Sequence, residues 1–416
     1  MTFIPFRAIS TEEAIALDEA YGAHNYAPLP VVVSRGRGAH VWDPEGKEYL
    51  DFLSGICSVS QGHCHPRLVA SLCEQAQRLT MPSRAFYTEN FGTFAKYATT
   101  YFGYDRILVM NTGVEAVETA IKLCRKWGYQ KKGIAANDAK IIFCQGNFHG
   151  RTMAAISAST SEDSKNHFGP FVPNFKAIPF NDLSALEKAL SDATVAGFVV
   201  EPIQGEAGVI VPGEGFLRKA YQLCKDANVL FIADEVQTGL GRTGKLLACD
   251  HEGVRPDIVI LGKALSGGML PVSAILADDP VMLTFTPGDH GSTFGGNPLA
   301  CAVARTALEI IKEENLVENA ARLGELFREG LKDLPSPVLE VRGKGLLNAI
   351  QFEAKEGLSA KDICLALKDH GLLTKNTRET IIRFAPPLVI QEGEMREAIA
   401  IIRTTLQEKY PKHPKR

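Results

Sequence analysis

The sequence predicts an α/β fold in which a large domain with a mostly parallel sheet stands beside a smaller α+β domain. Between about residues 67 and 304, short apolar segments alternate with amphipathic ones, which is typical of a parallel sheet covered by helices on both faces. The length of 416 residues also favours a second domain. We predict an N-terminal segment (1–66) packing with the small domain, a large domain (67–304) and a C-terminal small domain (305–416).

Each element is expected from its local pattern. Residues 41–52 predict a hairpin that turns at Pro44-Glu45-Gly46. In the large domain we expect helices at 68–79, 114–127, 183–190 and 216–227, and strands at 106–110, 140–143, 176–179, 197–201, 229–234, 257–261 and 272–276. A long helical region at 298–334 follows, then strands at 338–341, 346–352 and 381–384 and helices at 360–370 and 394–408.

Composition narrows the function classes and the compartment. The formal net charge of −3 gives no reason to expect a nucleic-acid partner, and no apolar run is long enough to span a bilayer. The nine cysteines are scattered, which favours reduced thiols, and residues 1–7 resemble neither a signal peptide nor a transit segment. We therefore predict a cytoplasmic protein. No metal site is predicted, because His63-Cys64-His65 has no second ligand cluster.

Two strand ends indicate the chemistry. Asp234 ends one predicted strand, and Lys263 follows the next, within Gly-Lys-Ala-Leu-Ser-Gly-Gly. Pyridoxal phosphate needs a carboxylate that keeps its pyridine nitrogen protonated and a lysine that carries it as a Schiff base. Alone, Asp234 is more often a helix cap and Lys263 a surface residue. Together, after consecutive strands, they favour the cofactor hypothesis.

Three loops are candidates for the rest of the pocket. Thr112-Gly113 opens a helix after a strand and suits a phosphate, although a plain N-cap at Thr112 is the alternative. Phe148 and Arg151 follow another strand and suit a flat ring and a carboxylate, or else core packing and a surface ion pair. A hydroxyl-bearing loop lies at 291–298. The glycine spacing matches no dinucleotide or P-loop motif, so nucleotide binding is set aside.

These stretches resemble the class III aminotransferases, which are fold-type I pyridoxal phosphate enzymes, over almost the whole chain. Within that class the resemblance is strongest to the members that use ornithine. It is carried by residues 21–26 (Tyr-Gly-Ala-His-Asn-Tyr), 111–116 (Asn-Thr-Gly-Val-Glu-Ala), 200–208 and 234–239, and by the Lys263 and Thr293 loops. It implies catalytic roles for Lys263 and Asp234. It further implies cofactor binding by Thr112, Gly113, Val114, Phe148, His149, Gln237, Ser292 and Thr293. The last two would reach the partner subunit's phosphate, which implies a homodimer with shared active sites.

The resemblance also implies the substrates. Tyr26 and Arg151 would hold the α-amino and α-carboxylate groups of ornithine. Glu206 would pair with Arg383 until 2-oxoglutarate takes its place. The products would be glutamate and glutamate-5-semialdehyde, which cyclises to pyrroline-5-carboxylate, and this links the reaction to arginine metabolism and proline biosynthesis.

Ile56 stands at a position where the members that use ornithine carry a tyrosine. An aliphatic residue at this position is similar to γ-aminobutyrate aminotransferases. This residue keeps γ-aminobutyrate open as a substrate, whereas Tyr26 argues against N-acetylornithine, the other ω-aminotransferase substrate considered. An aminomutase that binds a single substrate is a further alternative, against which the Glu206/Arg383 pair argues. A binding protein without catalysis is the remaining one, and it would not need Lys263 with Asp234.

Overall fold

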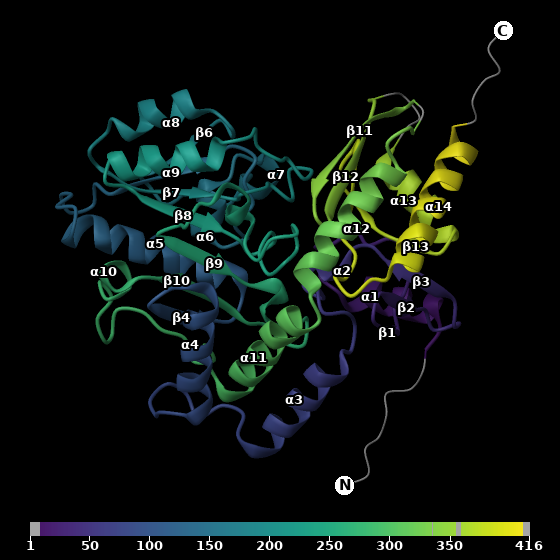
Figure 1. Cartoon of the computed structure of the whole chain (residues 1–416), viewed down its shortest axis with the longest axis horizontal. Coiled ribbons are helices and arrows are strands. Elements are labelled where there is room, and N and C mark those ends of the chain that lie inside the picture. The colour runs from purple at the N-terminus through teal and green to yellow at the C-terminus, as the bar shows by residue number, and fades with distance from the viewer. Residues whose placement is uncertain (1–8, 335, 355–358, 411–416) are drawn as a thin grey trace.

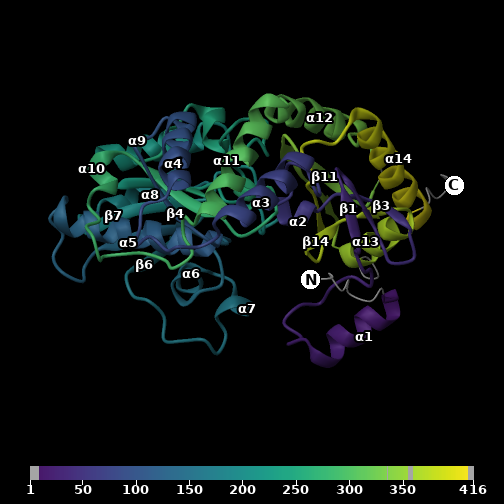
Figure 2. The same cartoon turned by 90° about the horizontal axis from the view of Figure 1, so that it is seen from below.

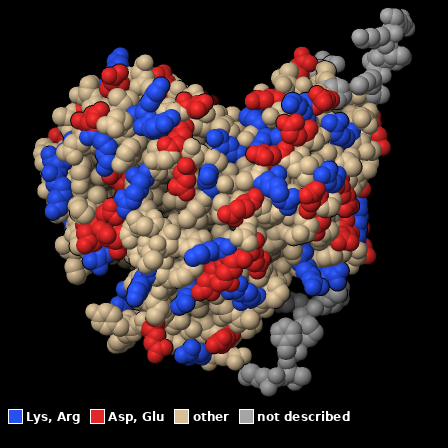
Figure 3. All heavy atoms as spheres, in the orientation of Figure 1, with Lys and Arg blue, Asp and Glu red and all other residues tan. Residues whose placement is uncertain are grey.

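The computed structural model describes residues 9–334, 336–354 and 359–410, which form a larger and a smaller lobe (Figure 1). The predicted α/β class is confirmed. On the face shown in Figure 3, acidic and basic side chains are intermixed. Within the described part of the chain, no helix combines the length and the apolar character needed to cross a membrane.

A seven-stranded sheet forms the centre of the larger lobe. Its order is β4 (Arg106–Met110), β10 (Ser273–Ala277), β9 (Ile258–Leu261), β8 (Leu230–Asp234), β7 (Val195–Val200), β5 (Lys140–Cys144) and β6 (Phe175–Ile178). Every strand is parallel to the others except β10, which runs antiparallel to both neighbours. The link from β9 to β10 is too short for a crossover helix, so the chain turns back.

Alternate side chains of the sheet pack under different helices. Ile141 and Phe143 belong to the core beneath α5 (Gly113–Gln130), whereas Ile142 and Cys144 belong to the core beneath α8 (Leu183–Leu190) and α9 (Phe216–Asp226). All four side chains are buried. Both faces of the strand are therefore apolar, and this explains the continuous apolar runs of the sequence.

The smaller lobe contains two four-stranded sheets. One is antiparallel, in the order β11 (Val338–Lys344), β12 (Leu347–Phe352), β15 (Ile381–Phe384) and β14 (Lys375–Arg378). The other is β1 (Arg35–Arg37), β2 (His40–Trp42), β3 (Glu48–Asp51) and β13 (Leu372–Leu373). Strands β2 and β3 form the predicted hairpin, whereas β13 is parallel to β3 and comes from the C-terminal part of the chain.

The helical region expected at 298–334 is two helices, α11 (Pro298–Glu313) and α12 (Leu316–Gly330). Between them Asn315 takes a left-handed conformation with φ of 52°, which asparagine tolerates better than most residues, and the chain changes direction there. Helices α13 (Ala360–Asp369) and α14 (Glu392–Lys409) complete the smaller lobe.

The remaining helices are α1 (Thr11–Tyr21), α2 (Ser54–Cys57), α3 (Pro66–Arg78), α4 (Glu89–Phe102), α6 (Met153–Ala158), α7 (Glu162–Lys165) and α10 (Asp279–Met282), with short 3₁₀ helices at Ala248–Glu252 and Lys263–Ser266. Helix α1 buries none of its residues and lies on the outside of the smaller lobe, where the backbone N–H and the hydroxyl of Thr11 donate to Glu45 (Figure 2).

Candidate active site

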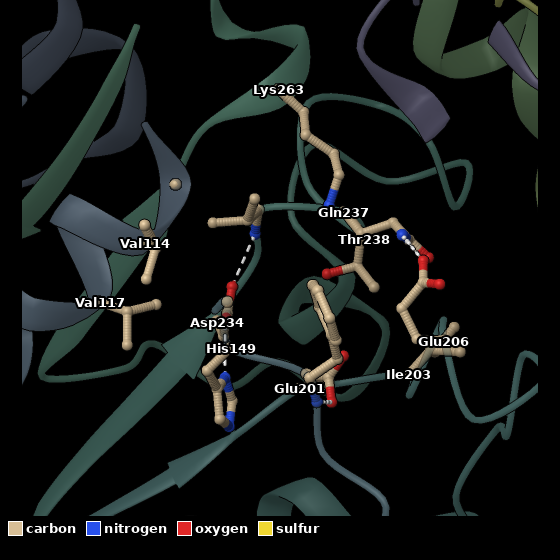
Figure 4. A pocket seen from close by; sticks show the side chains of 14 residues that line it. Val114, Val117, His149, Glu201, Ile203, Glu206, Asp234, Gln237, Thr238 and Lys263 are labelled. Carbon is tan, nitrogen blue, oxygen red and sulfur yellow. Dashed lines mark hydrogen bonds and ion pairs between the residues drawn. The ribbon is translucent and has the colours of Figure 1, made fainter. Parts of the chain in front are cut away.

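A cavity of about 190 Å³ opens where the parallel strands of the large sheet end (Figure 4). Its wall is formed by the start of α5 and by the residues that follow β5, β7, β8 and β9. The lining residues are Gly113, Val114, Val117, Phe148, His149, Gly150, Glu201, Ile203, Glu206, Asp234, Val236, Gln237, Thr238 and Lys263. Ligands of open α/β sheets bind at this edge, because the loops there bring separate strands to one place.

Lys263 extends into the cavity towards Gln237 and Thr238 (Figure 4). It follows β9 and begins a 3₁₀ helix, with a left-handed backbone of φ 44°. A left-handed lysine is strained by about 1 kcal/mol or more, and such strain persists where surrounding packing fixes the residue. The residues after it, Ala264 and Leu265, are buried and provide that packing.

Asp234 and His149 form a buried pair below the lysine. Nδ1 of His149 lies 2.7 Å from Oδ2 of Asp234, and because a carboxylate only accepts, Nδ1 donates. The backbone N–H of Val236 donates to Oδ1 at 3.1 Å. Burial disfavours a charged imidazole, but the hydrogen bond and the charge of Asp234 outweigh it and raise the pKa of His149. The pair fixes the orientation of the Asp234 carboxylate.

Glu201 is a second buried acid in the cavity wall. It follows β7 directly and accepts a hydrogen bond of 3.0 Å from the backbone N–H of Phe148. Burial, opposed by the charge of His149 and reinforced by that of Asp234, raises the pKa of Glu201 to about 8. The carboxyl group is therefore protonated at neutral pH and adds no charge beside Asp234.

Glu206 and Arg383 form an ion pair at the cavity edge. Nη1 of Arg383, on β15, donates to Oε1 of Glu206 at 2.5 Å, and Gln237 Nε2 donates to the same oxygen at 3.1 Å. Arg383 is 2% exposed, and its Nε has no hydrogen-bond partner among the described residues. Burial would raise the pKa of Glu206, but the charge and hydrogen bond of Arg383 lower it, so Glu206 stays ionised.

The start of α5 forms a cradle with open backbone. A Cβ on Gly113 would lie 2.9 Å from Cγ1 of Val236, so a larger residue would crowd this wall. As the first residues of the helix, Gly113 and Val114 have N–H groups that no preceding turn accepts. Thr112 is the N-cap, in a capping box with Glu115, as the alternative interpretation of the sequence held. Its hydroxyl accepts from the N–H of Glu115, and the next two residues, Gly113 and Val114, line the cavity.

Seven predicted site residues do not line this cavity in the described part of the chain. Two of them adjoin it, since Thr112 directly precedes Gly113 and Arg383 donates to Glu206. Tyr26 is 79% exposed, and Ile56 is 38% exposed in a left-handed turn. Arg151 is exposed, with its guanidinium 5.8 Å from the ring centre of Phe148. Ser292 accepts a hydrogen bond of 2.9 Å from Asn111 beside the cradle, and Thr293 is exposed.

Sequence reasoning missed Glu201, Thr238, Val236, Val117 and Ile203 as lining residues. A signal for Glu201 was present, since it is a polar residue directly after a wholly apolar strand, as Asp234 is the last residue of β8. For the apolar residues no local signal distinguishes a cavity wall from ordinary core.

Residues 21–406 match the family model described as aminotransferase class-III. The chain belongs to the class III aminotransferases. A relative from Drosophila melanogaster named ornithine aminotransferase, mitochondrial, is 58% identical over 95% of this chain and 92% of its own.

Solved structures agree with this membership. An ornithine aminotransferase from Toxoplasma gondii superposes with a TM-score of 0.95 at 50% identity, covering 97% of this chain and 95% of its own. An acetylornithine aminotransferase from Elizabethkingia anophelis superposes with a TM-score of 0.88 at 52% identity, covering 96% and 100%.

The cavity of this class III aminotransferase fits pyridoxal phosphate, the cofactor of the family. The Toxoplasma structure carries that cofactor in its active site. In the present chain, the cradle at Gly113, the carboxyl group of Asp234 and the amine of Lys263 lie around one cavity, and they match the phosphate, the pyridine nitrogen and the aldehyde of the cofactor. This enzyme is a pyridoxal phosphate-dependent transaminase.

The predicted cytoplasmic location is wrong. Several relatives at 55–58% identity are named mitochondrial, which contradicts it. The prediction came from scattered cysteines, seven of which are buried, and from the lack of a signal-like or transit-like pattern in residues 1–7. Reduced thiols exclude an oxidising compartment, but they do not distinguish one reducing compartment from another.

Proposed function

We propose that this aminotransferase transfers the δ-amino group of L-ornithine to 2-oxoglutarate, giving glutamate and glutamate-5-semialdehyde, which cyclises to pyrroline-5-carboxylate. The observation that carries the proposal is the Glu206–Arg383 pair at the cavity edge. Of the two substrates, only 2-oxoglutarate has a carboxylate beside the reacting carbon. The enzyme therefore needs a cation that binds this carboxylate and that another group neutralises when ornithine is bound. The names of the relatives support the same substrate.

The pair works as a mask because an unpaired buried guanidinium is costly. With ornithine bound by its δ-amine, no carboxylate lies near Arg383, and Glu206 satisfies it. With 2-oxoglutarate bound, the α-carboxylate takes the place of Glu206 on Arg383, where a bidentate contact is favourable. A fork that includes Nη1, the nitrogen that Glu206 contacts, uses Nη2 as its second donor.

The other residues act on protons and on orientation. Bound pyridoxal phosphate supplies an electron sink for deprotonation of the carbon that bears the amine. Lys263 Nζ would take that proton and deliver it to the cofactor within the same half-reaction, and it would carry the reverse transfer in the second half-reaction. Asp234, held by His149, would pair with the pyridine nitrogen of the bound cofactor. Phe148 would stack on the ring face, and Gln237 would contact the ring hydroxyl.

The proposed active enzyme is a homodimer with shared sites. In the single chain Tyr26, Tyr87 and Phe294 are 79%, 101% and 58% exposed, and large exposed aromatic side chains favour cover by another subunit. Ser292 and Thr293, next to Phe294, would then reach the phosphate of the partner subunit. Tyr26 and Arg151 would hold the α-amino and α-carboxylate groups of ornithine.

N-Acetylornithine is the second candidate substrate, because a structure of that specificity is as similar in sequence as the ornithine enzymes of known structure. Ile56 keeps γ-aminobutyrate open as well. The test is kcat/KM for ornithine, N-acetylornithine and γ-aminobutyrate with 2-oxoglutarate, followed by glutamate formation, with Lys263→Ala as the inactive control. Ornithine should give the largest value. A larger value for either competitor would assign the enzyme to that substrate instead.

A further inference from the structure

Glu206 stands on a tight turn whose shape is held from several sides. Gln204 and Ile210 pair through both of their backbone groups, at 3.1 and 2.9 Å. Inside the turn, the N–H groups of Gly208 and Val209 both donate to the carbonyl of Gly205 at 3.1 Å. The larger lobe holds the base of the turn, because Gln204 Nε2 donates to the carbonyl of Gln145 at 2.8 Å.

This turn is strained and packs tightly. Val209 is fully buried with φ of 55°, a conformation that β-branched residues rarely adopt. Gly208 has φ of 116°, and a Cβ there would lie 2.6 Å from Cδ1 of Ile381 on β15. Strain of this kind persists only where neighbouring groups fix the backbone. The structure therefore requires a group that holds residues 208 and 209.

That group is the guanidinium of Arg342 on β11. Its Nη2 donates to the carbonyl of Gly208 at 2.7 Å, and its Nε lies 3.1 Å from the carbonyls of both Gly208 and Val209. Nη1 donates to Gln351 at 2.6 Å and to Glu340 at 2.7 Å. The Arg342 side chain is only 11% exposed, so solvent competes little for these contacts.

Arg342 and Arg383 approach the turn from one row of the small-lobe sheet. Arg342 is opposite Ala349, and Ala349 is opposite Arg383. Side chains at directly paired positions lie on the same face of a sheet. Between the two arginines stands only the methyl group of Ala349, which is buried. One arginine thus binds the carbonyls of the turn, and the other binds the carboxylate of Glu206.

We propose that Arg342 is a positioning residue that holds the 204–210 turn so that Glu206 masks Arg383, and that it thereby favours an ω-amine over an α-amino acid as amino donor. The inference rests on the proposed function. With the turn loosened, the carboxylate of Glu206 is held less firmly against Arg383. The carboxylate of glutamate can then reach Arg383. Ornithine, in contrast, binds beside a cation that Glu206 no longer fully neutralises.

The test is Arg342→Lys in the holoenzyme. An ammonium group cannot contact both carbonyls with the fork of a guanidinium. The kcat/KM of each amino donor, ornithine and glutamate, is measured from the absorbance change of the bound cofactor. The ornithine-to-glutamate ratio should fall about tenfold, as expected for lost hydrogen bonds to a charged group. Amide hydrogen exchange at Gly208 and Val209 should increase, since their protection depends on the turn.

Glu340→Gln is the matched control. It removes the exposed ion pair of the same guanidinium and leaves the contacts to the turn, so the ratio should not change. A second test variant, Gln351→Leu, keeps the guanidinium but removes one of the two acceptors of Nη1, the part-buried one, and should lower the ratio in the same direction by less. Gln351→Leu is the variant to measure if Arg342→Lys does not fold.

A double variant separates positioning from general stability. If Arg342 acts through Glu206, Arg342→Lys should change the ratio no further in a Glu206→Ala background. The proposal is overturned by an unchanged ratio in Arg342→Lys, by equal loss for both donors, or by full additivity with Glu206→Ala. Lack of ornithine turnover in the unmodified enzyme would instead refute the proposed function, and the hydrogen exchange and the γ-aminobutyrate-to-glutamate ratio would still test Arg342.

Discussion

Replacing Glu206 by alanine would remove the carboxylate that masks Arg383. Two hydrogen bonds would be lost, the 2.5 Å contact from Arg383 and the 3.1 Å contact from Gln237. Arg383 is buried and would be left with an unpaired charge. Every substrate with a carboxylate beside its reacting carbon could then bind this cation, whereas ornithine bound by its δ-amine could not.

The size of the effect follows from the burial of the pair. Breaking a fully buried ion pair costs about 3–5 kcal/mol. The Glu206 side chain is 31% exposed, so water reaches part of the site and the lower range for a charged hydrogen bond, about 1.5–2 kcal/mol, applies. This corresponds to a fall of roughly ten- to thirtyfold in the preference for ornithine over glutamate as amino donor.

The assay is the half-reaction of the holoenzyme with each amino donor, followed by cofactor absorbance and expressed as the ratio of kcat/KM. Glu206→Gln is the control, because its amide oxygen still accepts from Arg383 without the charge, and its ratio should be intermediate. If Glu206→Ala left the ratio unchanged or raised it towards ornithine, the masking role of Glu206 would be refuted.

Three further changes test other parts of the site. Asp234→Asn should slow single-turnover amination by roughly a hundredfold or more with little loss of bound cofactor, and near-normal rates would remove Asp234 from the mechanism. For Glu201, whose buried carboxyl has a pKa of about 8 against 4.5 when exposed, the folded chain keeps a proton that the unfolded chain has released. Stability of the cofactor-free protein should therefore fall from pH 5 to 8, and Glu201→Gln should flatten this fall in thermal unfolding; equal pH profiles would contradict the shift. Ile56→Tyr should raise the kcat/KM ratio of ornithine to γ-aminobutyrate roughly ten- to a hundredfold, and an unchanged ratio would leave Tyr26 and Arg151 as the determinants.

The apolar strands that precede Asp234 and Lys263 were the signal for these two residues, but Glu201, which follows a strand of the same kind, was missed. Asp234 and Lys263 stand at the ends of β8 and β9, and parallel strands place such residues at one edge of the sheet. The roles of Tyr26 and Ile56 stay predictions, because in a single chain both side chains are exposed and a second subunit lies outside local sequence patterns. Arg342 was not foreseen, since a charged residue on a strand gives no sign of the backbone it will contact.

Helices and strands could be predicted where their own sequence pattern determines them. They could not be predicted where pairing with a distant part of the chain determines them. The strands at 106–110 and 381–384 have the predicted bounds. Strand β13 is only two residues long and forms because β3 offers a free edge. The direction of β10 depends on the length of its connection to β9, which a strand pattern does not show.

The pairing of β3 with β13 has a consequence for synthesis. On a ribosome, β3 emerges early, but Leu372 and Leu373 emerge only when most of the chain has been made. The large sheet, whose strands all lie between Arg106 and Ala277, can assemble while β3 still has an unpaired edge. Exposed strand edges in nascent chains are prone to aggregation. The edge of β3 therefore stays open to pairing with other strands until Leu372 and Leu373 have been made.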